Sequence, residues 1–413
     1  MNYNHIFDAS SSLEKGENAR QPCMPSFVSG DQISGVFSVC PKSDMTFSNL
    51  HIFLIGEEST SMRTGALERA HHQFLQLEQP LLPTELPNPR VLKKGAKYKF
   101  PFAFTVPDYL PNSVCLHPSS NPSLRAAHLD LPPSFGGNTT GFGRKPRNDY
   151  ASPKVEVGYT IQGRTQWISP LSGDQETILS TTLRVRITPV LDVTPLPGFG
   201  LGPLNEEFAA QREETFYSKK SKLSLGRLTV TLDDPDCLWL PTPDSGVRGT
   251  IDVTIKLQYI PINLRSTHIS HIPAISSLKG HLAVTTIFTT TITEESTAPA
   301  KRRSFFRQPQ NYHEKKLPLP IPSSVALSWT RDSEDSYTST LSIPVSLPNE
   351  NLVPTFHSCL ISRIYNLGFQ VCLSQTDTVP VKVKVSAPIK IAAKREQGAL
   401  PSYDAVTRLG HMS

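Results

Sequence analysis

Two histidine pairs in this sequence have a spacing that could bind a metal ion. His71 is followed directly by His72, and His268 precedes His271 by three residues. Imidazole nitrogens bind zinc well, but zinc sites usually complete their shell with cysteine or carboxylate ligands at short spacing, and no such ligand accompanies either pair. The sequence therefore predicts surface histidines, no metal site and no cofactor.

The signatures of the commonest enzymes do not occur in the sequence. The chain has no Gly-x-x-x-x-Gly-Lys phosphate loop, no His-Glu-x-x-His pair and no Gly-x-Ser-x-Gly elbow. Catalytic groups that converge from distant positions leave no trace of this kind, so an enzyme stays a minor alternative. We predict a protein without catalytic residues.

Leu400, Pro401, Ser402 and Tyr403 form a short motif after the last strand-like segment. A polyproline II helix has three residues per turn, so Leu400 and Tyr403 would share one face. Pro401 fixes its own φ and biases Leu400 toward extended backbone, which lowers the entropy lost on docking to a groove. The segment 131–135, LPPSF, is nearly the same motif but ends in phenylalanine, and we interpret it as structural.

A basic cluster with two phenylalanines lies in the second half of the chain. Its cations are Lys301, Arg302, Arg303 and Arg307. Each such charge contributes about 1 kcal/mol to binding at an anionic membrane surface. The same segment equally fits a solvated loop that is phosphorylated on Ser304. Both interpretations stay open.

Length and composition indicate two domains built of short strands. The chain has 413 residues, more than one ordinary core holds, and 37 prolines and 23 glycines accompany a hydrophobic fraction of only 38%. The net charge of +5 is too small to indicate a nucleic-acid-binding protein. The six cysteines are widely spread without a Cys-x-x-Cys pair, which favours reduced thiols. The start of the sequence has no signal-peptide pattern, so we expect a cytosolic protein.

Segments that alternate apolar and polar residues predict an all-β protein. In the first half they are residues 27–39, 47–55, 73–77, 97–106, 155–167 and 181–193. In the second half they are residues 222–232, 247–259, 281–292, 325–329, 339–345, 355–374 and 379–391, after a short helix expected from Asn205 to Arg212. No βαβ alternation occurs, so the pattern is typical of antiparallel sandwiches.

The expected organisation is two tandem immunoglobulin-like antiparallel β-sandwiches. A flexible N-terminus (1–20) precedes an N-terminal sandwich (21–193) that carries a long loop (107–153). A linker rich in proline and glycine (194–203) leads to a C-terminal sandwich (204–395) with a basic loop (296–322) and to a disordered tail (396–413).

Several stretches, taken in order, resemble the arrestin superfamily and in particular the fungal α-arrestins, or arrestin-related trafficking adaptors. In the first half they are FVSGDQISGVFSV (27–39), TFSNLHIFLIGEEST (46–60) and LKKGAKYKFPFAFTVPDYLPNSV (92–114). In the second half VPTFHSCLISRIYNLGFQVCLS (353–374) is similar to a closing segment of the family's C-terminal domain. The resemblance implies the arrestin fold, two β-sandwiches joined by a short hinge.

The resemblance also implies a function without catalysis. Proteins of this family bind membrane transporters or receptors and bring them to a HECT-type ubiquitin ligase, whose WW domains bind Pro-Tyr motifs, for ubiquitin-dependent endocytosis and sorting. Leu400, Pro401, Ser402 and Tyr403 would be the ligase-docking residues, and one such motif would dock weakly. The implied location is the cytoplasm, with recruitment to the plasma membrane and endosomes.

Two other interpretations remain. The chain could be an arrestin-fold scaffold or sorting-coat subunit that acts without a ligase, because it carries a single Leu-Pro-x-Tyr motif. A distant alternative is an immunoglobulin-like DNA-binding protein, although no nucleic-acid partner is expected from the charge.

Overall fold

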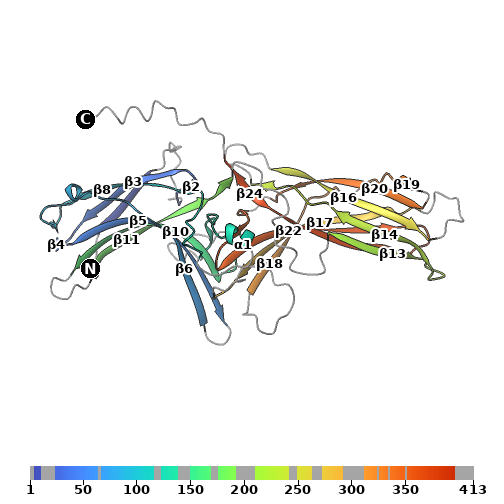
Figure 1. The fold of residues 1–413 in the computed structure, drawn as a ribbon, viewed down its shortest axis with the longest axis horizontal. Coiled ribbons are helices and arrows are strands. Elements are labelled where there is room, and N and C mark those ends of the chain that lie inside the picture. Colours follow the sequence, from blue (N-terminus) through green and yellow to red (C-terminus); the bar gives the residue numbers. More distant parts are fainter. Residues whose placement is uncertain are drawn as a thin grey trace, which may run out of the picture.

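The structure is a computed structural model of the chain. It describes residues 4–10, 24–63, 67–115, 122–137, 149–168, 175–191, 210–240, 249–262, 272–291, 311–322, 325–333, 335–348 and 351–395. The strands form an elongated molecule with one group of sheets at each end (Figure 1). We call these groups the N-terminal half and the C-terminal half.

The N-terminal half has two main sheets. One sheet has the order β1-β3-β8, formed by β1 (Asn4–Ser10), β3 (Gln32–Cys40) and β8 (Tyr98–Thr105). The other has the order β2-β11-β10-β5-β6, formed by β2 (Ser26–Val28), β11 (Gln175–Thr188), β10 (Val155–Ile168), β5 (Asn49–Arg63) and β6 (Leu67–Glu78), and β9 (Phe135–Gly136) pairs with β10. The smaller elements are β4 (Met45–Thr46), β7 (Val91–Leu92), the 3-10 turn η1 (Pro83–Glu85) and the helix α1 (Pro122–Ala127).

The C-terminal half repeats this plan. One sheet has the order β13-β14-β16-β20-β19, formed by β13 (Gln211–Tyr217), β14 (Ser224–Leu232), β16 (Thr250–Pro261), β20 (Ser336–Ser346) and β19 (Thr330–Ser333). The other has the order β18-β17-β22-β21, formed by β18 (Asn311–Pro318), β17 (Ala274–Phe288), β22 (Ile361–Ser374) and β21 (Phe356–His357), and β23 (Val381–Ile389) pairs with β22. All pairings within these two sheets are antiparallel.

A small parallel sheet connects the two halves. Its central strand β24 (Ile391–Lys394) pairs with β12 (Val190–Leu191) from the N-terminal half and with β15 (Leu238–Trp239) from the C-terminal half. The two halves are therefore joined by backbone hydrogen bonds as well as by side chains.

Burial follows the period of two that the sequence predicts. On β8, Phe100, Phe102 and Phe104 are buried while the residues between them are exposed. A strand buries alternate side chains when one face meets a core and the other meets water. The structure confirms the predicted fold class, two tandem antiparallel β-sandwiches with the arrestin fold.

The pattern of alternation breaks at one end of the C-terminal half. Residues 282–288 of β17 and 361–365 of β22 are buried on both faces. These two segments pair with each other, Phe288 opposite Ile361 and Thr286 opposite Arg363. A strand loses alternation when both of its faces are covered, so this end of the sheet enters the contact between the halves.

Three expectations from the sequence are wrong in part. Asn4–Ser10, expected in the flexible N-terminus 1–20, forms β1 and pairs with β3. Asn311–Pro318, expected within the basic loop 296–322, forms β18 because its backbone completes the free edge of β17. Arg212, expected in a helix, lies in β13, where pairing with β14 overrides helix propensity.

The long loop 107–153 is mostly irregular where the structure describes it, with α1 and β9 as its regular elements. The linker 194–203 and the tail 396–413 lie outside the described residues. Among the residues that the structure describes, no helix has the length and apolar character needed to cross a bilayer.

Candidate functional site

The two halves meet in a closely packed region that we call the junction. It consists of β5, β6 and the described parts of the loop 107–153 on one side, and of the end of β17 with residues 351–363 on the other. Apolar residues of the C-terminal half join the hydrophobic core of the N-terminal half there. They are Phe288, Val353, Phe356, Leu360 and Ile361. The rings of Phe135 and Phe356 meet edge to face across the junction at 5.5 Å.

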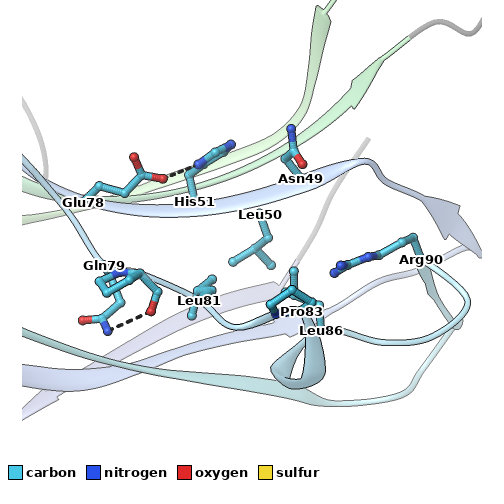
Figure 2. Close-up of a pocket in the computed structure, with 10 residues that line it drawn as sticks. Asn49, Leu50, His51, Glu78, Gln79, Leu81, Pro83, Leu86 and Arg90 are labelled. Carbon is cyan, nitrogen blue, oxygen red and sulfur yellow. Dashed lines mark hydrogen bonds and ion pairs between the residues drawn. The ribbon is translucent and has the colours of Figure 1, made fainter.

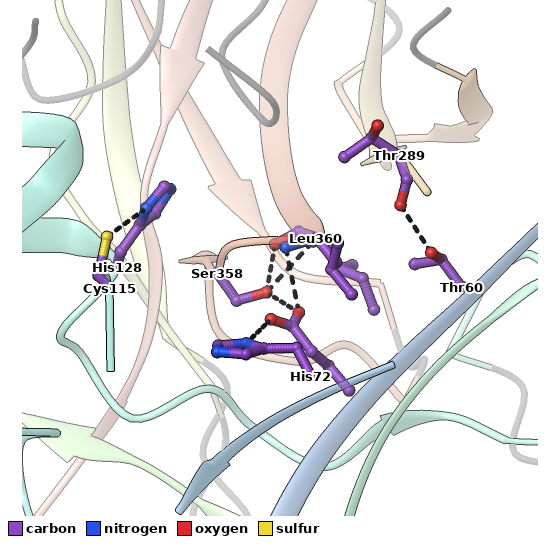
Figure 3. A network of polar contacts seen from close by, with 9 residues as sticks. Thr60, His72, Cys115, His128, Thr289, Ser358 and Leu360 are labelled. Atoms are coloured by element: carbon purple, nitrogen blue, oxygen red, sulfur yellow. Dashed lines mark hydrogen bonds and ion pairs between the residues drawn. The ribbon is translucent and has the colours of Figure 1, made fainter. Parts of the chain in front are cut away.

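Glu58 is a carboxylate of the N-terminal half that is buried at the junction. Its exposed fraction is 0%, and it lies on β5 opposite His72 of β6. His72 Nδ1 donates to Glu58 Oε1 at 2.8 Å, while the Ser358 hydroxyl and the Leu360 backbone N–H, at 3.4 Å, donate to Oε2 (Figure 3). The hydrogen bond to Glu58 raises the pKa of His72 above its usual value. Three donors therefore stabilise the buried carboxylate, two of them from the opposite half.

Arg363 is a positively charged residue of the C-terminal half that is also buried at the junction. It lies on β22 with an exposed fraction of 0%. Its Nη1 donates to Thr286 Oγ1 at 2.6 Å and to the Tyr150 carbonyl at 3.4 Å, and its Nη2 donates to the Asp149 carbonyl. The guanidinium also lies over the Phe135 ring at 4.9 Å. Carbonyl dipoles and an aromatic face thus stabilise the buried positive charge of the guanidinium.

One hydroxyl contact and one arginine join the two halves at the margins of the junction. Thr60 Oγ1 donates to the Thr289 carbonyl at 2.6 Å (Figure 3). Arg395, which follows β24, donates to the Ser29 carbonyl and to Asp108 Oδ1, each at 2.8 Å. The last described residue of the chain is therefore held against the N-terminal half.

Two cysteines and a histidine come together in the interior beside these contacts. Cys115, His128 and Cys359 have exposed fractions of 1%, 2% and 2%, and their sulfur and nitrogen atoms all lie within 4.8 Å of one another. Cys115 Sγ is 3.5 Å from His128 Nδ1 (Figure 3). Burial raises the pKa of the Cys115 and Cys359 thiols. The set was missed by sequence reasoning, because its members are far apart in the chain.

The histidine pair 71–72 divides between surface and interior. His71 is exposed and lies 3.4 Å from Glu57, as expected of a surface histidine. His72 is half-buried against Glu58, so the expectation of a surface position is wrong for this residue. Neighbouring residues in a strand point to opposite faces, which is the reason for the difference. His268 and His271 lie outside the described residues.

The predicted docking residues belong to segments outside the described part of the chain. Lys301, Arg302, Arg303 and Arg307 lie outside the described residues, and so do Leu400, Pro401, Ser402 and Tyr403. The LPPSF segment is described, and its structural interpretation is confirmed. Leu131 and Phe135 each have an exposed fraction of 1%, and the Pro132 carbonyl accepts a hydrogen bond from Tyr159 Oη at 2.5 Å.

A hollow of about 360 Å³ lies on the outside of the N-terminal half, between β5 and the segment 78–90 (Figure 2). His51 Nδ1 and Glu78 Oε1 pair at 2.5 Å on one side of it, and Arg90 lies on the other, over the Phe47 ring. Leu50, Leu81 and Leu86 also line it. The hollow offers polar side chains and an apolar floor to a peptide, and no arrangement of nucleophile and base.

One buried pair has the residue types of a nucleophile and its base. His357 Nδ1 lies 3.0 Å from Ser362 Oγ. Burial, with Lys390 nearby, lowers the pKa of His357 to about 4. The exposed fractions are 9% for His357 and 0% for Ser362. A general base needs a pKa near working pH and access to a substrate, so this pair is a structural hydrogen bond.

One known family matches part of the C-terminal half. Residues 275–392 match the family model described as the Bul1 C terminus. The matched residues run from β17 to β24 and include the C-terminal contribution to the junction, with Ser358, Cys359 and Arg363. A search of curated proteins finds no match to the chain. The match supports the resemblance to arrestin-related proteins.

Proposed function

We propose that this protein is an adaptor that binds a membrane transporter or receptor and recruits a HECT-type ubiquitin ligase with WW domains, for ubiquitin-dependent endocytosis and sorting. The observation that carries the proposal is the match of residues 275–392 to the Bul1 C terminus within an arrestin fold. Bul1 is a yeast arrestin-related trafficking adaptor. The two halves are joined by buried apolar and polar contacts at the junction, which would hold two binding surfaces of an adaptor together.

The ligase contact is assigned to Leu400, Pro401, Ser402 and Tyr403. A WW domain binds a polyproline II segment, and Leu400 and Tyr403 would lie on the same face of that helix. The anchoring of Arg395 by Ser29 and Asp108 supports this assignment, because the residues that follow start from a fixed point beside the N-terminal half.

The membrane contact is assigned to the basic cluster of Lys301, Arg302, Arg303 and Arg307. The strand that follows it, β18, forms an edge of its sheet and exposes Lys315 and Lys316. The positive charges of the cluster and of this exposed edge would together favour binding to the anionic inner leaflet of a membrane. We place the protein in the cytoplasm, recruited to the plasma membrane and endosomes, with no nucleic-acid partner and no catalytic residue of its own.

Affinity purification of the full chain beside its Tyr403→Ala variant tests the proposal. We expect peptides of a WW-domain ubiquitin ligase with the wild type and a loss of at least about tenfold with the variant, because the tyrosine is an anchor of the motif. Tyr312→Ala is the matched control, since Tyr312 is exposed at 72% on β18 and should leave the ligase bound.

The scaffold or sorting-coat alternative gives a different result in the same experiment. If the ligase is absent from both samples, or is retained equally by Tyr403→Ala, the ligase contact at Leu400–Tyr403 is wrong. Normal trafficking of the cargo after deletion of residues 396–413 would then favour an arrestin-fold scaffold that acts without a ligase.

A further inference from the structure

Cys115, His128 and Cys359 are the starting point because their atoms converge from both halves of the molecule. Cys115 and His128 belong to the long loop 107–153 on the N-terminal side, and Cys359 belongs to the turn between β21 and β22 on the C-terminal side. We infer that these three side chains bind a zinc ion that clamps the loop 107–153 to this turn.

The distances fit a tetrahedral zinc site. Zinc–sulfur bonds are about 2.3 Å and zinc–nitrogen bonds about 2.0–2.1 Å, so tetrahedral geometry separates sulfur from nitrogen by about 3.6 Å and two sulfurs by about 3.8 Å. Cys115 Sγ and His128 Nδ1 are 3.5 Å apart, and all three donor atoms fall within 4.8 Å. Small side-chain rotations would place the three atoms around one ion.

The donor set also fits zinc chemically. Two thiolates and an imidazole are ligands that zinc prefers, and thiolates disfavour magnesium and calcium. Two thiolate charges balance Zn²⁺, so the ion, the two cysteines and the neutral histidine together carry no net charge. Zinc binds cysteine as the thiolate, so zinc binding would release the protons of both thiols.

The fourth tetrahedral position has a donor nearby. Glu58, His72 and Cys359 form a second group whose ligand atoms lie within 4.8 Å of one another, and Cys359 is common to both groups. A water molecule or an oxygen of Glu58 can therefore complete the shell. The zinc ion would then lie beside the hydrogen bonds that join Glu58 to Ser358 and Leu360.

A disulfide is the main rival explanation of two neighbouring buried cysteines. It would form only between Cys115 and Cys359, would not use His128, and would lower the mass of the chain by two hydrogen atoms. Reduced thiols that only form hydrogen bonds are the other rival. Metal content and intact mass, measured on the same sample, separate these states from a zinc site.

The experiment is metal analysis of the full chain purified without chelator, and again after chelation and addition of zinc. We expect about one zinc per chain in both samples, and a loss of at least about fivefold in Cys359→Ser and in His128→Gln. Cys237→Ser is the matched control, because Cys237 is also buried but lies in neither group, and it should keep its zinc.

Cobalt(II) provides a measurement on the wild type that does not depend on the folding of variants. Cobalt bound by two thiolates in a tetrahedral site gives strong visible bands and a thiolate-to-metal charge-transfer band in the near ultraviolet. Absence of zinc after reconstitution, absence of these bands, retention of zinc by both variants, or a Cys115–Cys359 disulfide in the intact mass would each overturn the inference.

Discussion

Glu58 and Arg363 are buried charges that opposite halves of the molecule place at the junction, and they are stabilised in different ways. Glu58 accepts hydrogen bonds from a side chain of its own half, His72, and from a turn of the other half, Ser358 to Leu360. Arg363 donates to backbone carbonyls of the other half, at Asp149 and Tyr150, and lies on an aromatic ring.

These two environments differ in how well an uncharged side chain could replace the charged one. A carboxylate and an amide have nearly the same shape, and an amide oxygen can still accept hydrogen bonds from a turn. The guanidinium has five N–H donors in one plane, and no other side chain presents them together. The junction should therefore tolerate a change at Glu58 better than a change at Arg363.

Arg363→Met should have the largest effect. It leaves the carbonyls of Asp149 and Tyr150 and the Thr286 hydroxyl without their donor, and we expect a loss of about 3–5 kcal/mol of unfolding free energy. The measurement is urea unfolding followed by tryptophan fluorescence, together with small-angle scattering to detect separation of the halves.

Arg227→Met is the control for Arg363→Met. Arg227 pairs with Glu213 at 3.3 Å on the surface, where both side chains are 53% exposed. Exposed pairs contribute at most about 1 kcal/mol, so the change should be small. Equal effects at Arg363 and Arg227 would contradict the role given to the buried guanidinium.

Glu58→Gln should have an intermediate effect. The amide oxygen can keep the contacts to Ser358 and Leu360, while the amide nitrogen can donate to a neutral His72, and we expect a loss of about 1–2 kcal/mol. Glu58→Ala should cost more, because it removes every acceptor. If Glu58→Gln and Arg363→Met lower the free energy of unfolding equally in the same urea titration, the junction does not tolerate a change at Glu58 better than one at Arg363.

Thr60→Val should have a smaller effect. It removes one hydroxyl that donates across the junction to the Thr289 carbonyl, a contact that we expect to contribute about 1 kcal/mol. Thr330→Val is the control, because the Thr330 hydroxyl is exposed on β19 and its contacts lie within one sheet. Thermal unfolding of both variants beside the wild type would show whether the contact between halves matters.

The smallest effect should come from the titration of His281 on β17, the strand that pairs with the strand of Arg363. Burial and the charges of Lys316 and Lys384 lower the pKa of His281, while Glu314 acts in the opposite direction. A lowered pKa in the folded state means full stability above the unfolded value of about 6.5 and a loss as pH falls below it.

His281→Gln should flatten the acid side of the stability profile between neutral pH and the lowered pKa. The measurement is unfolding by urea at a series of pH values, with Lys316 and Lys384 unchanged. His71→Gln is the control, because His71 is exposed. Its Nε2 lies 3.4 Å from Glu57 Oε2 at the surface. An acid-side slope identical in wild type and His281→Gln would contradict the assignment.

The sequence by itself determined the fold class and most of the strands. Alternation at Phe100, Phe102 and Phe104 is a local property, because a strand turns each residue to the opposite face from its neighbours. The edge strand β18 was not predicted, because the exposed residues of Asn311–Pro318 show no alternation and only pairing with β17 makes the segment a strand.

Only the tertiary structure decided the junction. Glu58 and Thr60 lie in a stretch that looks solvent-exposed by composition, yet both are buried because the C-terminal half covers that face of β5. Cys115, His128 and Cys359 are separated by long stretches of chain, so their spacing predicts nothing about their convergence. The period of apolar residues predicts which face of a strand is buried. It does not predict the contacts between the two halves, because these depend on how one folded sandwich packs against the other.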